Sequence, residues 1–399
     1  MAGVRTRRRA ERRERRRAAR RGIMVGTAAA VVAVGTAMGM VSAVGGEDPG
    51  RDTARTAETT RPPTTAPLPA RPAVSPAPSA ASKSPPAPSA SPSAVPKSAP
   101  KRSAAPAPFP EPGGGVLYRH PDSQVIDWVR AHRGDPRRAL IEARIAARPA
   151  AVWFAAHNPG EITGEVRAVT SGAAALGRVP ILVPYAIPDR DCGGASQGGA
   201  PDLDAYGRWI GEFADGLGTA PVIVVLEPDS LALSDCLSSA DRAARSAALA
   251  KASRILKAAN PRAKVYFDAG HSGWHSPATM ARLLRAAGAA TGGDGIFTNV
   301  SNFHRTADET RYARAVLDAL GGPARLGAVI DTSRNGNGAP RAGAWCDPGG
   351  RALGQAPTTR TGQARIDAFL WIKLPGESDG CRGAAGSFTP DYAYDLATG

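Results

Sequence analysis

The stretch Val222-Ile-Val-Val-Leu-Glu-Pro-Asp-Ser230 sets the architecture, because five apolar residues in a row end at a Glu-Pro-Asp corner. A short, continuously apolar run of this kind is typical of a strand that is buried on both faces, as in a parallel sheet. A long amphipathic stretch, residues 240–259, follows within a few residues. The segment therefore predicts a strand, a polar loop and a helix in sequence.

The same unit recurs from residue 109 to the end of the chain. The candidate strands are Ala151 to Phe154, Val179 to Pro184, Val222 to Glu227, Val265 to Asp268, Gly295 to Asn299, Leu326 to Asp331, and Phe369 to Lys373. The candidate helices include Asp202 to Leu217, Ala240 to Ala259, Pro277 to Ala287 and Asp308 to Leu320. This alternation predicts an α/β fold, a distorted TIM-like barrel of about seven parallel strands. An open doubly wound sheet has similar periodicity, but no glycine-rich phosphate fingerprint follows the first strand.

The first quarter of the chain cannot build a core. Residues 1–22 carry eleven Arg and two Glu, and no charge follows until after residue 46. This pattern predicts either a cleaved signal peptide or a membrane anchor over residues 23–46, and both place the remaining chain outside the cell. Residues 47–108 are rich in Pro, Ala, Ser and Thr without an apolar period, which predicts a disordered linker before a catalytic domain over 109–399.

The net charge of +15 is concentrated near the start of the chain. Residues 1–108 hold 19 of the 50 basic residues and 6 of the 35 acidic ones, so the candidate domain is nearly neutral. A nearly neutral domain has no electrostatic footprint for a phosphate backbone. We therefore expect no binding of nucleic acid. We also expect a monomer that is exported, either secreted or anchored on the outer face of a membrane.

Carboxylates, amides and aromatic rings follow the ends of almost every candidate strand, the position of the catalytic face in a barrel. The clusters are Trp153 with Asn158; Tyr185 to Asp191; Glu227, Asp229 and Ser230; Asp268, His271 and Trp274; Asn299 and Asn302; Asp331 to Gly336; and Lys373, Glu377 and Asp379. Glycosidic bonds are cleaved by an acid and a base, and sugar faces pack on indole rings. The clusters therefore indicate glycoside hydrolysis, which needs no cofactor.

Metal-dependent hydrolysis is the competing interpretation of such clusters. His271 and His275 have the spacing of helical zinc ligands, but Gly273 and Pro277 predict a loop there, and no Glu lies between the two histidines. The sequence therefore favours a site without a metal.

Five segments in order resemble the cellulases of glycoside hydrolase family 6. They are Pro188-Asp-Arg-Asp-Cys-Gly193, Glu227-Pro-Asp-Ser-Leu231, Tyr266-Phe-Asp-Ala-Gly-His271, Asp331-Thr-Ser-Arg-Asn-Gly336 and Trp371 to Gly380. The resemblance covers essentially all of residues 109–399. It implies a distorted barrel, a β-1,4-glucan substrate, and inversion at the anomeric carbon.

The resemblance also implies roles for four carboxylates. Asp229 occupies the position of the general acid, which needs a raised pKa to hold its proton near neutral pH. Asp191 is the second carboxylate, expected to raise the pKa of Asp229 by like-charge repulsion. Asp379 matches the proposed base, and an inverting enzyme would place the acid and base carboxyls roughly 6.5 to 9.5 Å apart. Asp268 matches a supporting carboxylate near the cleavage site.

Other positions match the family by resemblance as well. Tyr185 would lie beneath the distorted sugar, and Ser196 would help to hold the attacking water. The positions that would contact sugars are Trp153, His271, Trp274, Asn302, Trp345, Lys373 and Glu377.

Four cysteines, all after residue 109 and with no closely spaced pair, indicate two disulfides in an oxidising compartment. The resemblance pairs Cys192 with Cys236 and Cys346 with Cys381.

Only twenty residues follow Asp379, where cellobiohydrolases of the family have a long excursion that roofs the site. We therefore expect an open groove and an endo-β-1,4-glucanase. The alternatives are an exo-acting cellobiohydrolase, a mixed-linkage β-glucanase, and a carbohydrate-binding wall protein without activity.

Overall fold

The structure is a computed structural model that describes residues 116–399. The expected leader over residues 1–46 and the linker over 47–108 lie outside the described residues and stay predictions. Within residues 116–399, no helix is both long and apolar enough to cross a membrane. The alternative of an anchor over residues 23–46 also falls outside this range.

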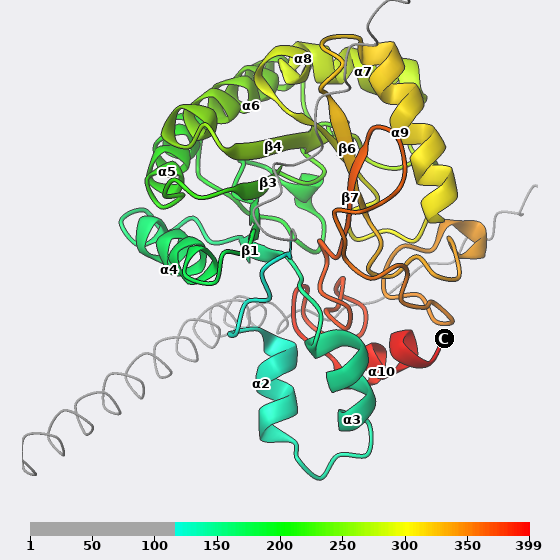
Figure 1. Cartoon of the computed structure of the whole chain (residues 1–399). Helices are drawn as coiled ribbons and strands as arrows, with labels where there is room; N and C mark the ends of the chain where they lie inside the picture. Colours follow the sequence, from blue (N-terminus) through cyan, green and yellow to red (C-terminus); the bar gives the residue numbers. More distant parts are fainter. Residues whose placement is uncertain (1–115) are drawn as a thin grey trace, which may run out of the picture. The chain divides into compact units, whose positions relative to one another are not determined.

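Seven parallel strands form one sheet whose spatial order follows the chain (Figure 1). The strands are β1 (Val152–Phe154), β2 (Ile181–Pro184), β3 (Val222–Leu226), β4 (Ala263–Asp268), β5 (Gly295–Thr298), β6 (Gly327–Asp331) and β7 (Ile366–Leu370). The residue before β1 and the residue after β7 are joined by a backbone hydrogen bond from Ala151 N to the Trp371 carbonyl at 2.9 Å. The curled seven-stranded sheet confirms the predicted distorted barrel.

Helices alternate with the strands. They are α2 (Gln124–Ala131), α3 (Arg138–Ile141), the π-helix η1 (Glu142–Ala146), α4 (Ile162–Ala174), α5 (Leu203–Asp215), α6 (Ser239–Ala259), α7 (Pro277–Ala286), α8 (Ala289–Gly292), α9 (Thr306–Leu320) and α10 (Pro390–Thr398), with short 3-10 turns η2 (Asp191–Gly193) and η3 (Arg341–Gly343). Figure 1 shows α4 to α9 around the outside of the sheet and α2, α3 and α10 grouped at one end. Three of the long helices begin at side-chain caps, because Asp202, Ser238 and Ser276 each accept a backbone N–H of the first turn.

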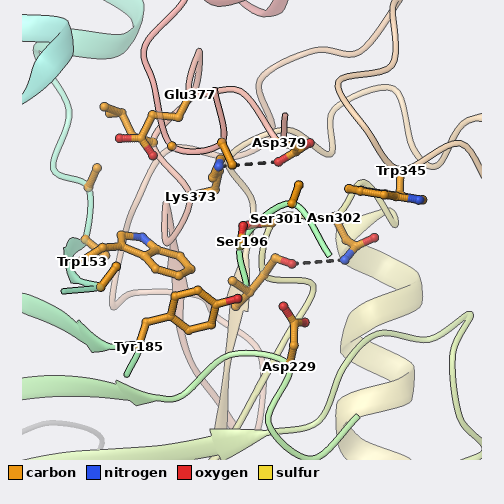
Figure 2. A pocket seen from close by; sticks show the side chains of 18 of the residues that line it. Trp153, Tyr185, Ser196, Asp229, Ser301, Asn302, Trp345, Lys373, Glu377 and Asp379 are labelled. Atoms are coloured by element: carbon orange, nitrogen blue, oxygen red, sulfur yellow. Dashed lines mark hydrogen bonds and ion pairs between the residues drawn. The ribbon is translucent and has the colours of Figure 1, made fainter. Parts of the chain in front are cut away.

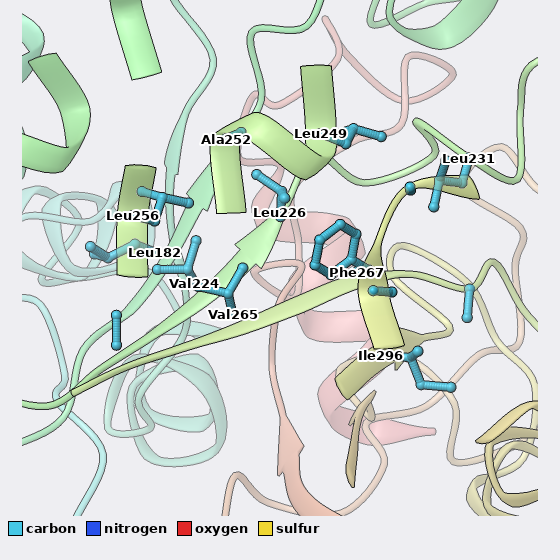
Figure 3. Packing of buried hydrophobic residues seen from close by; sticks show 14 of the residues in the cluster. Leu182, Val224, Leu226, Leu231, Leu249, Ala252, Leu256, Val265, Phe267 and Ile296 are labelled. Atoms are coloured by element: carbon cyan, nitrogen blue, oxygen red, sulfur yellow. The ribbon is translucent and has the colours of Figure 1, made fainter. Parts of the chain in front are cut away.

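Both faces of β2, β3, β5 and β6 are buried, as the apolar runs predict, whereas Val152 and Trp153 of β1 are half-buried. In β3, Val224 and Leu226 pack outward against the helices, and Ile223 and Val225 pack inside the barrel. This division follows from the two-residue period of a strand. Figure 3 shows the outer layer, where side chains of α6 such as Leu256 lie over the sheet.

The last strand begins earlier than predicted. The sequence places it at Phe369 to Lys373, whereas β7 spans Ile366–Leu370. The charge of Asp367 breaks the apolar run in the sequence. In the structure, however, Asp367 accepts a hydrogen bond from the Tyr266 hydroxyl at 2.8 Å. This carboxylate within β7 is therefore satisfied by a residue of β4, a strand with which β7 is not paired in the sheet, and sequence periodicity cannot show such a contact.

A separate apolar cluster joins the two ends of the described chain. Ala393 and Ala397 of α10 pack with Ile141 and Ile145, and Trp371 belongs to the same cluster. The segment that follows Asp379 therefore leads to a helix packed against the N-terminal helices.

Candidate active site

A groove of about 1130 Å³ lies over the carboxyl ends of the strands. Twelve of the thirteen predicted catalytic and sugar-contacting residues line it: Trp153, Tyr185, Asp191, Ser196, Asp229, His271, Trp274, Asn302, Trp345, Lys373, Glu377 and Asp379. The thirteenth, Asp268, is 2% exposed and is not part of the lining. The fold therefore brings together residues that are up to 226 positions apart in the chain.

Asp229 lies just beyond β3, where the chain turns through a left-handed conformation with φ of 67°. Burial, together with the negative charges of Asp268, Asp191 and Asp379, raises the pKa of the Asp229 carboxyl to about 8. This carboxyl therefore keeps its proton at neutral pH. Sequence reasoning names repulsion from Asp191 as the cause, but burial contributes most and Asp268 contributes before Asp191.

Asp268, at the end of β4, holds the loop that follows Asp229. Its carboxylate accepts backbone N–H groups from Leu231 at 3.0 Å, Ala232 at 2.8 Å and Gly270 at 2.9 Å. Burial raises the pKa of Asp268, although these hydrogen bonds lower it. Asp268 therefore contacts the loop after Asp229 through backbone N–H groups.

Glu227 is fully buried beneath the same region. Its Oε2 atom accepts the backbone N–H groups of Ala186 and Ile187, each at 3.0 Å, directly after Tyr185. Burial raises the pKa of Glu227 to about 7, against the lowering effect of these hydrogen bonds. Glu227 therefore ties the strand end that carries Asp229 to the one that carries Tyr185.

The loop of Asp191 folds back on itself. Asp191 Oδ2 accepts the Ser196 backbone N–H at 2.6 Å, and Arg190 Nε donates to the Ser196 carbonyl at 2.8 Å. The Arg190 guanidinium also lies 4.6 Å from the centre of the Tyr185 ring. Sequence reasoning missed Arg190, although it stands inside the Pro188-Asp-Arg-Asp segment.

Tyr185 and Trp153 form one wall of the groove (Figure 2). Their rings meet edge to face with centroids 5.2 Å apart, and the Trp153 indole N–H donates to the Ile372 carbonyl at 2.7 Å. Burial, together with Asp229 and Asp191, raises the pKa of Tyr185, so its phenol stays neutral. The pair offers a fixed apolar surface with one hydroxyl.

Asp379 lies across the groove from Asp229 in Figure 2. Arg334 donates to Asp379 Oδ2 at 2.7 Å, and the Lys373 ammonium is 3.5 Å from Oδ1. Arg334 is fully buried, and its guanidinium lies 4.4 Å from the centre of the Phe303 ring. Two cationic side chains therefore contact the carboxylate expected to act as the base. Arg334 is a second residue that sequence reasoning missed.

Aromatic rings line the rest of the groove. Trp345 is 59% exposed, the most exposed tryptophan among residues 116–399. The His271 ring lies 5.3 Å from Trp274 and stacks on His304 at 4.2 Å. Burial lowers the pKa of His271 to about 3, as do the charges of His304 and His275, so the ring stays neutral.

His271 and His275 belong to no metal cluster in the described part of the chain. The His275 ring nitrogen Nε2 lies 2.8 Å from the Ala232 carbonyl. Over residues 116–399, no group of three or more His, Cys, Asp or Glu side chains is arranged to hold a metal ion.

Residues near the start of the described chain extend the groove, which no motif predicts. Arg119, His120 and Arg148 line it, as does Gln124. Gln124 Nε2 donates to Glu377 Oε1 at 3.1 Å and to the Gly386 carbonyl at 2.7 Å. The helix α2 is thereby joined to the loops that follow β7.

Two disulfides join the loops around the site. Cys192 pairs with Cys236, which links the Asp191 loop to the segment after Asp229, and Cys346 pairs with Cys381, two residues beyond Asp379. These are the pairs that the resemblance implies.

The chain is similar to proteins of known family. Residues 117–398 match the family model for Glycosyl hydrolases family 6. Endoglucanase 1 of Streptomyces sp. (strain KSM-9) is 56% identical over 284 residues, which span 71% of this chain and 78% of that protein. Endoglucanase A of Thermobispora bispora is 50% identical over 282 residues, 70% of this chain and 61% of that protein.

A solved structure is also similar. It is the endoglucanase Cel6 from Mycobacterium tuberculosis in complex with methyl-cellobiosyl-4-deoxy-4-thio-β-D-cellobioside, with a TM-score of 0.66 and 41% sequence identity. The match covers 72% of this chain and 97% of that one.

Proposed function

The chain belongs to glycosyl hydrolase family 6, and we propose from this that it is an endo-β-1,4-glucanase that inverts the anomeric carbon. The observation that carries the proposal is the contrast between two carboxyls of one groove. The pKa of Asp229 is raised to about 8 by burial and by neighbouring carboxylates, whereas Asp379 is paired with Arg334 and Lys373. Two carboxyls in such different environments, one with a raised pKa and one paired with two cations, are expected of a general acid and a general base.

The proposed reaction assigns one step to each carboxyl. Asp229 donates its proton to the glycosidic oxygen as the bond to the anomeric carbon breaks. Asp379 takes a proton from a water that attacks the opposite face of the sugar. Asp191 and Asp268 act electrostatically by keeping Asp229 protonated. The 6.5 to 9.5 Å separation between the acid and base carboxyls remains a prediction of this mechanism.

The course of the chain after Asp379 supports internal cleavage. Within two residues Cys381 is tied to Cys346, and the Gly386 carbonyl accepts a hydrogen bond from Gln124. The chain then enters α10, which packs against the N-terminal helices. Ala385 and Gly386 line the groove, and the residues of α10 pack at one end of the barrel, a course that supports the proposal of an open groove.

Replacing the acid tests the proposal. The Asp229→Ala variant should lose about 10²- to 10⁴-fold in kcat on carboxymethyl-cellulose, because leaving-group protonation contributes on that order. On β-cellobiosyl fluoride, whose leaving group needs little protonation, the variant should keep most of its activity. Asp204→Ala, in the exposed first turn of α5, is the matched control and should hydrolyse both substrates like the parent.

Two results would refute the proposal. If the Asp229→Ala variant hydrolysed unactivated glucan at the wild-type rate, Asp229 would not be the general acid. If the wild-type enzyme released mainly cellobiose from chain ends, without an early fall in the viscosity of carboxymethyl-cellulose, the assignment of internal cleavage would be wrong. A panel of soluble glucans separates a β-1,4 preference from a mixed-linkage preference.

The two disulfides also support export, since disulfides persist in oxidising compartments. We propose that residues 109–399 form the exported catalytic domain and act as a monomer. Size-exclusion chromatography with light scattering tests the monomer.

A further inference from the structure

Asp347 lies beneath the loop that carries Asp379 and belongs to none of the motifs that define the site. It is 4% exposed. Its Oδ1 atom accepts the Asp379 backbone N–H at 2.7 Å, and its Oδ2 atom accepts the backbone N–H groups of Cys381 at 3.0 Å and Arg382 at 2.9 Å. The Ser378 hydroxyl also donates to Oδ2, at 2.6 Å. One side chain thus binds four donors within five consecutive residues of the loop.

The backbone of Asp347 contacts the reacting carboxylate itself. The Asp347 N–H donates to Asp379 Oδ2 at 3.2 Å, the same oxygen that accepts from Arg334 at 2.7 Å. Asp379 Oδ1 faces the Lys373 ammonium at 3.5 Å. The orientation of the Asp379 carboxylate is therefore fixed through Oδ2, which leaves Oδ1 as the oxygen available to a water.

The position of Asp347 is itself constrained. Its backbone has a left-handed φ of 44°, uncommon for a residue other than glycine, asparagine or aspartate. The preceding residue, Cys346, is joined covalently to Cys381 of the loop. Burial alone would raise the pKa of Asp347, but hydrogen bonds from Ser378 and the loop amides lower it, so the side chain is an ionised acceptor.

We propose that Asp347 is a positioning residue for the base, which aims the Asp379 carboxylate at the attacking water by holding residues 378–382. The inference rests on the proposed function, because it takes Asp379 as the base. A misplacement of about 1 Å at a reacting group can cost about 10²-fold in rate, so the orientation of this loop should appear in kcat.

The isosteric substitution Asp347→Asn tests the proposal. An asparagine offers one acceptor oxygen instead of two, so its NH₂ group must face loop donors on one side or the other. We expect kcat on cellohexaose to fall by about 10- to 100-fold. The KM, and the Kd of a thio-linked cello-oligosaccharide that is not hydrolysed, should stay within twofold, because no sugar-contacting residue is changed.

Asp294→Asn is the matched control. Asp294 is 5% exposed and precedes β5, at the opposite end of the sheet from the groove, where it pairs with Lys257 at 2.8 Å and Lys264 at 3.3 Å. Its substitution should lower the stability to urea without changing kcat. This control separates a buried carboxylate that only stabilises the fold from one that positions the base.

A second variant, Ser378→Ala, keeps the proposal testable if Asp347→Asn fails to fold. It removes one donor to Asp347 and should lower kcat severalfold at unchanged KM. Wild-type kcat in the folded variant or variants, or an equal loss of ligand affinity, would overturn the inference. A parent enzyme without activity on β-1,4-glucan would instead overturn the proposed function, so the two failures are distinguishable.

Discussion

Replacing Glu227 by Gln should change the pH dependence of stability in a calculable way. Glu227 is fully buried, and its pKa rises from 4.5 to about 7 on folding. A carboxyl with a raised pKa binds more protons in the folded state, so stability falls as pH rises through the window from 4.5 to 7. The difference of about 2.5 pKa units corresponds to about 3 kcal/mol at 1.36 kcal/mol per unit.

Glutamine removes this titration and keeps the geometry. Both backbone donors, Ala186 N and Ile187 N, reach the same oxygen of Glu227, so a single amide oxygen can accept both. The free energy of unfolding of Glu227→Gln, relative to wild type, should therefore increase by about 3 kcal/mol between pH 4.5 and pH 8.

The assay is urea unfolding followed by tryptophan fluorescence at several pH values, with the disulfides intact. The control is Glu161→Gln, at an exposed position, for which the difference from wild type should not vary with pH. If the difference in the free energy of unfolding between Glu227→Gln and wild type also did not vary with pH, Glu227 would be ionised in the folded protein, and the explanation by burial would be wrong.

Three further predictions concern activity and the loops. The kcat/KM of the wild-type enzyme should fall as pH rises past about 8, because Asp229 must be protonated to act as the acid; a pH profile that stays flat to pH 10 would contradict this. Replacing both Cys192 and Cys236 by Ser should lower the free energy of unfolding by about 4 kcal/mol in the chain-entropy model for a separation of 44 residues, measured by urea unfolding. An unchanged free energy of unfolding would contradict a stabilising disulfide between these two residues. Trp345→Ala should weaken the binding of a thio-linked cello-oligosaccharide about tenfold, measured by calorimetry. Trp128→Ala, on α2 and outside the groove lining, should leave this binding unchanged. Equal losses of affinity in the two variants would contradict the assignment of Trp345 as a sugar contact.

Periodicity predicts the barrel well because its signals are local. Five apolar residues before Glu227 and capped helices such as α6 depend on neighbouring positions alone. The start of β7 is missed because Asp367 is satisfied by Tyr266, a residue 101 positions away.

For the site, too, local signals could be predicted from the sequence and long-range contacts could not. Residues inside motifs, such as Asp229 and Asp379, could be placed from the sequence because strand ends converge in a barrel. The roles of Arg334, although it lies inside the Asp331 to Gly336 segment, and of Asp347 could not be predicted, since they depend on contacts with Asp379 across 45 and 32 positions. Gln124 and its neighbours line the groove only because α2 packs beside the loops that follow β7.

Proton NMR of the first product, recorded before mutarotation, tests whether the two carboxyls act on opposite faces of one sugar. During hydrolysis of cellohexaose by the wild-type enzyme, the α-anomer should appear first at the newly formed reducing end. Initial appearance of the β-anomer would mean retention of configuration, and would contradict the assignment of Asp229 as acid and Asp379 as base.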